Sequence, residues 1–214
     1  MAKRIFITAT NTDVGKTYTT IKLLHEYASR GLRVGAIKPI ETGVFDTPSD
    51  GLKLLNTLQT LNSDFENLGI ESIVPISYEL PAAPYVASNG KKLDLETLDR
   101  SVEKLDEMCD VLLIEGAGGL FVPLDEDFMI IDLIKRFRSR ALLVTHCSLG
   151  CINDSILSSK ALDEYNISHT VAFNCKCDDS NFKIVSKPYF DGVGFSVMQV
   201  DEDIADIADR LLNI

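Results

Sequence analysis

The chain has 214 residues, with 21 basic and 32 acidic side chains, so its formal net charge at neutral pH is −11. This acidic balance argues against nucleic-acid or membrane partners, because both nucleic acid and anionic lipid attract clustered cationic surfaces. No apolar stretch approaches the roughly 20 residues that cross a bilayer. The apolar run at the N-terminus stops at Thr8, which is too early for a signal peptide. We therefore expect a single domain over residues 1–214 and a cytoplasmic protein.

Five short apolar runs predict the strands of a sheet. They cover residues 4–9, 32–38, 111–115, 141–146 and 170–174. The runs are continuous rather than alternating, which is expected for strands that are buried on both faces of a parallel sheet.

Helical periodicity fills the intervals between several of these runs. Residues 16–30 follow the first strand and end before Gly31, a typical helix terminator. Apolar residues also repeat at three- and four-residue steps over residues 95–108 and 204–211. Strands that alternate with helices predict an α/β fold with an open, mostly parallel sheet and helices on both faces. Residues 62–90 are irregular and carry three prolines, so no elements are assigned there.

The cysteines predict reduced thiols rather than disulfides. Their number is odd, and their spacing is unlike that of small secreted proteins. Cys175 and Cys177 could suggest a metal clip, but no second Cys or His pair lies at ligand spacing from them. Reduced cysteines are usual inside cells.

Residues 7–17 join the first strand to the first helix and read Ile-Thr-Ala-Thr-Asn-Thr-Asp-Val-Gly-Lys-Thr. This is the context of a phosphate-binding loop, although the strict pattern has glycine where this chain has Thr10. Backbone N–H groups and the helix N-terminus surround an anion, Lys16 reaches the terminal phosphates, and the Thr17 hydroxyl ligates Mg²⁺. The predicted nucleotide-binding residues of this segment are Asp13, Val14, Gly15, Lys16, Thr17 and Tyr18. The fold prediction thereby becomes P-loop NTPase-like.

An acid and a glycine-rich segment follow the third strand. Glu115 comes where the apolar run ends, and Gly116, Ala117 and Gly118 come next. Ligands of open α/β sheets collect at the carboxyl ends of strands, and an acid there is costly without a partner. Glu115 is therefore a candidate metal ligand, and the small residues after it allow the nucleotide to approach the backbone.

Three further positions each allow two interpretations. Lys38 follows the second strand and either stabilises charge in phosphoryl transfer or extends to solvent. Asp50 either holds a metal or caps a helix. Residues 148–154 begin a helix whose free N–H groups either hold a substrate carboxylate or mark an ordinary helix start.

Taken in chain order, these segments closely resemble the dethiobiotin synthetase family. The matching residues are 8–17, 38–43, 49–50, 115–119 and 149–153, and the match runs to Asn174, about four fifths of the chain. The resemblance implies an ATP-dependent ligase that carboxylates 7,8-diaminononanoate with CO₂ and closes a ureido ring. In that family a carbamate of the diamine attacks the γ-phosphate of Mg-ATP, and the second amine then displaces phosphate.

The resemblance also implies a role for each matching residue. Lys38 would be the catalytic residue, and Asn174 would contact the base. The implied Mg²⁺ ligands are Thr17, Asp50 and Glu115. The implied diamine-binding residues are Thr42, Gly150, Cys151, Ile152 and Asn153, with Asn153 reaching across a homodimer interface.

Other functions stay open at this point. After Asn174 the chain lacks the proline of the family's base-packing element, so the choice among ATP, GTP and CTP is not determined. A partitioning-type switch ATPase usually has an additional lysine early in the loop, which is absent here. A non-catalytic regulatory domain of this fold should have lost site residues, whereas all are present. A relative acting on another diamine or diacid also fits the pattern.

Overall fold

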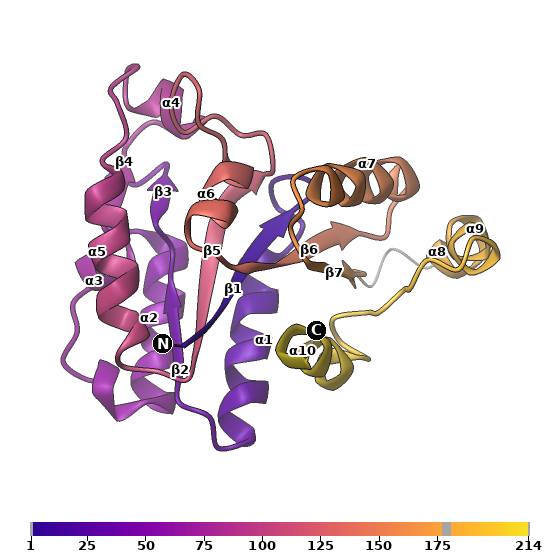
Figure 1. The fold of residues 1–214 in the computed structure, drawn as a ribbon, viewed down its shortest axis with the longest axis horizontal. Helices are drawn as coiled ribbons and strands as arrows, with labels where there is room; N and C mark the ends of the chain where they lie inside the picture. The colour runs from indigo at the N-terminus through magenta and orange to yellow at the C-terminus, as the bar shows by residue number, and fades with distance from the viewer. Residues whose placement is uncertain (1, 177–180, 214) are drawn as a thin grey trace.

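The computed structural model describes residues 2–176 and 181–213. Its centre is a five-stranded parallel sheet in the order β2-β5-β1-β6-β7 (Figure 1). The strands are β1 (Lys3–Ala9), β2 (Val34–Ile37), β5 (Val111–Gly119), β6 (Arg140–His146) and β7 (His169–Asn174). All five predicted strands are therefore confirmed.

Helices cover both faces of the sheet (Figure 1). One layer consists of α1 (Lys16–Ser29), α2 (Ser49–Leu61) and α10 (Ile204–Asn213), with α1 in contact with the other two. The opposite layer consists of α5 (Leu95–Asp106), α6 (Ile130–Arg136) and α7 (Cys151–Glu164). Within residues 2–176 and 181–213, no helix has the length and apolar character that crossing a membrane requires.

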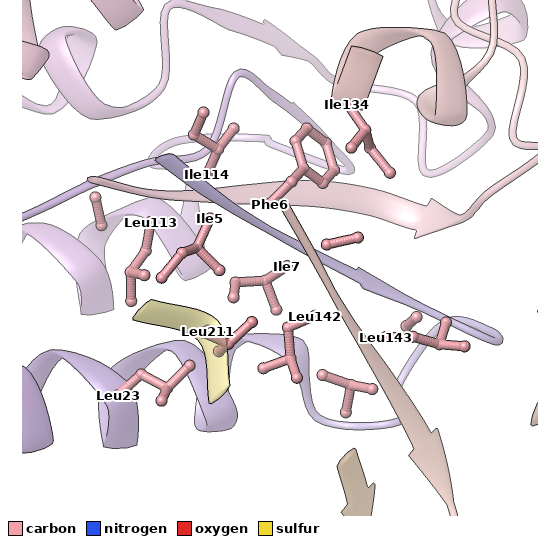
Figure 2. Close-up of a cluster of buried hydrophobic side chains, with 14 of the residues drawn as sticks. Ile5, Phe6, Ile7, Leu23, Leu113, Ile114, Ile134, Leu142, Leu143 and Leu211 are labelled. Atoms are coloured by element: carbon pink, nitrogen blue, oxygen red, sulfur yellow. The ribbon is translucent and has the colours of Figure 1, made fainter. Parts of the chain in front are cut away.

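Side chains of β1 alternate between two hydrophobic layers (Figure 2). Phe6 points toward Ile134 of α6, whereas Ile5 points to the other face, toward Leu23 of α1 and Leu211 of α10. All five side chains are buried. This burial on both faces explains why the strand sequences are continuously apolar.

The segment without a sequence assignment contains several very short elements. They are η1 (Ser63–Phe65), α3 (Ile70–Ile73), β4 (Ile76–Tyr78) and α4 (Pro84–Ala87). β4 pairs in parallel with β3 (Ile40–Thr42), and these two strands form a separate sheet. Elements of three or four residues are too short to show a readable hydrophobic period.

Two short helices follow the gap in the described residues. These are α8 (Phe182–Val185) and α9 (Lys187–Gly192). The rings of Phe182 and Phe190 lie 5.4 and 5.1 Å from the ring of Phe173 on β7. This aromatic cluster attaches the C-terminal segment to the edge of the sheet.

β5 is longer than predicted and carries Glu115 inside the strand rather than at its end. Glu115 pairs with Ile7 of β1, and the register shifts before Gly119, which pairs with Ala9. A Cβ on Gly116 would lie 2.7 Å from the ring of Phe6. The glycines therefore allow β5 to continue close to β1 beyond the end of the predicted strand.

The expectation of reduced cysteines is wrong for one pair, because Cys147 and Cys175 form a disulfide. Paired strands β6 and β7 align His146 with Asn174, so the next residue of each strand becomes a neighbour of the other. Their Cα atoms are 4.9 Å apart, within the usual range for a disulfide. Cys177, the other half of the considered metal clip, lies outside the described residues.

Burial, with a smaller contribution from Asp106, raises the pKa of the Cys109 thiol to about 12.

Candidate active site

The loop between β1 and α1 has the backbone of a phosphate-binding loop. Asp13 and Gly15 have φ values of 59° and 99°, whereas Thr10 is not in the left-handed region. Glycine is therefore not required at the position of Thr10, whose N–H donates to the Val144 carbonyl at 3.0 Å. Gly15 holds the cap position of α1 and has no side chain that could accept from the first N–H groups of the helix, which suits the binding of an anion there.

A cavity of about 640 Å³ lies beside this loop. Its walls come from the phosphate loop, the segment from Lys38 to β3, the start of α2, β5 and residues 81–84. The predicted site residues that line it are Asp13, Gly15, Lys16, Thr17, Tyr18, Lys38, Thr42, Asp50, Glu115, Ala117 and Gly118. Most of the predicted nucleotide site is therefore brought together around one cavity.

Glu115 is the fully buried centre of the polar network in this cavity. One carboxylate oxygen accepts hydrogen bonds from the Thr17 hydroxyl and the Lys38 ammonium, both at 2.8 Å. The other oxygen accepts from the Thr20 hydroxyl at 2.9 Å. These donors offset the cost of burying the carboxylate and fix its two oxygens toward the phosphate loop.

Lys38 does not extend to solvent but is buried between two carboxylates. Its ammonium nitrogen lies 2.8 Å from Glu115 and 3.5 Å from Asp50. Asp50 does not cap α2, because Pro48 holds the cap position and makes no side-chain hydrogen bond. The Asp50 carboxylate instead faces Lys38 and also contacts the exposed Lys53 at 3.1 Å.

The two buried lysines differ in their electrostatics. Burial, and next the positive charge of Lys38, lowers the pKa of Lys16 to about 8. Burial opposes the charged form of Lys38 as well, but the pKa of Lys38 is raised because Glu115 and Asp50 outweigh that cost. Lys38 therefore keeps its positive charge at neutral pH. Among the described residues, the carboxylates of Glu115, Asp50 and Asp13 act on Lys16 through their charge and not through a hydrogen bond.

The oxygen atoms in this cavity fit a magnesium ion. Thr17 supplies a hydroxyl, and Glu115 and Asp50 supply carboxylates that share Lys38 as a partner. Mg²⁺ prefers hard oxygen ligands, and it is commonly held by one or two carboxylates together with substrate phosphates. Within the described residues, no three acidic, His or Cys side chains form a metal site by themselves.

Other predicted residues lie outside this cavity. Gly150 precedes α7 with a φ of 104°, and it begins the expected carboxylate site formed with Cys151, Ile152 and Asn153. Neither these four residues nor Val14, Gly116 and Asn174 belong to the described residues that line the cavity.

The Asn174 amide nitrogen instead donates to the Val14 carbonyl at 2.8 Å. A Cβ on Gly15 would lie 2.0 Å from this nitrogen, so Asn174 also restricts this loop position to glycine.

Two residues of the network were not predicted. Thr20 lies three positions after Thr17, so helical spacing could have placed both hydroxyls on one face of α1. Glu41 is buried, and its carboxylate accepts from the N–H groups of Asp50 and Gly51 at 3.0 and 2.9 Å. No sequence signal links Glu41 to α2, because their partnership depends on how the chain returns after β3.

The low pKa of Lys16 predicts that nucleotide binding takes up a proton at alkaline pH. In the free protein the Lys16 amine loses its proton as pH rises through about 8. A bound triphosphate favours the charged amine and raises its pKa, so affinity should fall above that pH. Calorimetry at pH 8.5 in two buffers of different ionisation enthalpy should give different apparent binding enthalpies. Lys16→Arg is the control because arginine stays protonated, and equal wild-type enthalpies would contradict this prediction.

Comparisons with known proteins agree with this geometry. A family model described as an AAA domain matches residues 3–190. The chain is 46% identical over 189 residues to the ATP-dependent dethiobiotin synthetase BioD of Sulfurovum sp. strain NBC37-1, covering 88% of this chain and 90% of that protein. It is 37% identical to the protein of the same name from Wolinella succinogenes, with 99% of both chains covered.

Solved structures resemble the fold at much lower identity. The MinD cell division protein of Aquifex aeolicus superposes with a TM-score of 0.52 at 18% identity, covering 98% of this chain and 87% of that one. A ParA family ATPase from Chlorobium tepidum gives a TM-score of 0.54 at 12% identity, covering 99% and 92%. These likenesses confirm the predicted fold class, an open parallel sheet of the P-loop NTPase type.

Proposed function

The chain belongs to the ATP-dependent dethiobiotin synthetase family, and from this premise we propose how its residues carry out the reaction. It is an ATP-dependent ligase of biotin biosynthesis. The observation that carries the residue assignment is the buried contact of Lys38 with both Glu115 and Asp50 beside the phosphate loop. A lysine with this charge and place suits the neutralisation of negative charge during phosphoryl transfer.

The proposed reaction has three steps. One amine of 7,8-diaminononanoate attacks CO₂ and loses a proton, which gives a carbamate. A carbamate oxygen then attacks the γ-phosphorus of ATP, and ADP leaves. Finally the second amine attacks the carbonyl carbon of the resulting carbamic-phosphoric anhydride and loses a proton to solvent, inorganic phosphate leaves with the bonding pair, and the ureido ring of dethiobiotin closes.

Each group of the chain has one task in these steps. Lys16 and the N–H groups at the start of α1 hold the triphosphate, and Lys38 neutralises the carbamate and the phosphoryl group that moves to it. Thr17, Asp50 and Glu115 would hold Mg²⁺, which lowers the negative charge of the phosphates when bound. Ala117 and Gly118 allow the nucleotide close to β5, and Thr42 contacts the diamine.

The substrate carboxylate binds at the N-terminus of α7 in this proposal. Gly150, Cys151, Ile152 and Asn153 lie outside the cavity of their own chain, which supports a homodimer in which each α7 serves the partner's cavity. Sedimentation of the chain as a monomer under assay conditions would contradict the dimer.

The proposed coupling predicts that phosphate is released only when all reactants are present. The carbamate is the nucleophile, so ATP should stay intact without the diamine or without CO₂, and chelation of Mg²⁺ should also stop release. A continuous phosphate assay with single omissions measures this dependence. Steady phosphate release in the absence of the diamine would contradict the mechanism.

A partitioning-type ATPase is not favoured as an alternative. The solved structures of a MinD cell division protein, a ParA family ATPase and a plasmid partition protein share 11–18% identity with this chain. This level of identity supports the fold alone. Such a switch would hydrolyse ATP without a diamine, so the same omission assay separates the two functions.

A further inference from the structure

Glu41 is a buried carboxylate that the proposed reaction does not use. Its side chain lies on β3, three residues after Lys38, and Glu41 is 5% exposed. A buried carboxylate is costly unless hydrogen bonds compensate its lost hydration. Glu41 finds these bonds in two backbone N–H groups, those of Asp50 at 3.0 Å and Gly51 at 2.9 Å.

These two N–H groups are the ones that a helix cap normally satisfies. Asp50 and Gly51 are the second and third residues of α2, and Pro48 at the cap position makes no side-chain bond. An N-cap oxygen usually accepts from one of these positions. Glu41 therefore replaces the local cap from a neighbouring strand, and its negative charge also complements the positive end of the helix dipole.

The same contact fixes the residue that faces Lys38. The Asp50 backbone is bound to Glu41, while the Asp50 carboxylate lies 3.5 Å from the Lys38 ammonium. Tight packing leaves the helix start little freedom, because a Cβ on Gly51 would lie 2.1 Å from a methyl group of Val74. The short segment from Lys38 to Glu41 thus holds Asp50 at two points, one on its side chain and one on its backbone.

We propose that Glu41 is a positioning residue, which anchors the start of α2 so that the Asp50 carboxylate faces the phosphate loop together with Glu115. Glu41 is one of the residues that line the cavity, and in this role its carboxylate oxygens accept from the N–H groups of Asp50 and Gly51. Because the benefit to the reaction depends on Asp50 as a metal ligand, that part of the proposal rests on the proposed function. The anchoring itself depends only on the contacts of Glu41.

Amide hydrogen exchange of the nucleotide-free protein tests the anchoring. Glu41→Gln keeps the size of the side chain but loses the charge and one of its two acceptor oxygens. Exchange at Asp50 and Gly51 should become about tenfold faster or more, since hydrogen bonds to a charged group are the stronger class. The amides of Ile5 and Ile7 in β1 should stay protected, which shows that the fold is intact. Unchanged exchange at Asp50 and Gly51 would overturn the proposal.

Asp94→Asn is a matched control for this experiment. Asp94 also caps a helix with its carboxylate, accepting from the Thr97 N–H at 3.0 Å at the start of α5. The residue is exposed and does not line the cavity. Its variant should speed exchange at Thr97 and leave the Mg²⁺ dependence of dethiobiotin synthesis unchanged. A change in that dependence equal to the one caused by Glu41→Gln would overturn the special role of Glu41.

A double-mutant cycle with Asp50→Asn then tests the link to the reaction. Glu41→Gln alone should raise the Mg²⁺ concentration for half-maximal rate about tenfold, as loss of an outer-shell partner does. In the Asp50→Asn background the same change should add little, because both act through one carboxylate. Equal effects in both backgrounds would overturn the positioning role. A silent Asp50→Asn would instead contradict the proposed metal ligand, and hydrogen exchange alone would then decide the anchoring.

Discussion

Lys38→Ala is expected to lower turnover by about 10³-fold, the scale seen when a preorganised charge-stabilising group is removed. Lys38 is buried and contacts Glu115 and Asp50, the two carboxylates of the cavity. The methyl group of alanine leaves no cation to neutralise the carbamate and the moving phosphoryl group. Nucleotide affinity should change much less, because we propose that Lys16 and the N–H groups of the loop bind the triphosphate.

Measurements of kcat and of nucleotide affinity together test this role of Lys38. Loss of the buried ion pair should also lower the free energy of unfolding by about 3–5 kcal/mol, so thermal unfolding must show that the variant is folded at the assay temperature. Lys53→Ala is the matched control, since Lys53 contacts the same Asp50 from an exposed position. Wild-type turnover in Lys38→Ala would show that the assigned role is wrong.

Lys16→Ala is expected to weaken nucleotide binding, whereas Lys38→Ala is expected mainly to slow turnover. Burial, and next the charge of Lys38, lowers the pKa of the Lys16 amine, and this amine is the group that we propose meets the triphosphate. Removal of one partner from a buried charge pair costs about 2–5 kcal/mol, so nucleotide should bind roughly 10²-fold more weakly. Calorimetry with a non-hydrolysable ATP analogue measures this change directly.

Lys104→Ala is a suitable control for the loss of one positive charge. Lys104 is exposed in the last turn of α5 and does not line the cavity. Its removal should leave nucleotide affinity within about twofold, because surface charges contribute little at short range. Equal affinities of Lys16→Ala and Lys104→Ala would contradict the role of Lys16 in binding phosphates.

The sheet and the phosphate loop could be predicted because their signals are local in the sequence. The continuous apolar runs of β1 and β6 reflect burial on both faces, and the residues around Gly15 join a strand directly to a helix. The length of β5 could not be predicted, since Glu115 and the glycines after it suggest a strand end. Only pairing with β1 shows that the strand continues to Gly119.

The partners of the charged residues could not be predicted from the sequence. Asp50 allowed a capping or a metal-binding role, and the choice depends on Lys38 and Glu115, which are 12 and 65 positions away along the chain. The disulfide of Cys147 with Cys175 likewise depends on strand register rather than on spacing. These partnerships arise where loops bring strand ends together, and a single sequence does not encode them in any local pattern.

Product analysis by mass spectrometry is the most direct test of the proposed reaction. The wild-type protein, incubated with 7,8-diaminononanoate, bicarbonate as the CO₂ source, Mg²⁺ and ATP, should form dethiobiotin together with equal amounts of ADP and phosphate. With ¹³C-labelled bicarbonate the product should carry the label in its ureido carbon. ADP and phosphate without labelled dethiobiotin would contradict the assigned reaction.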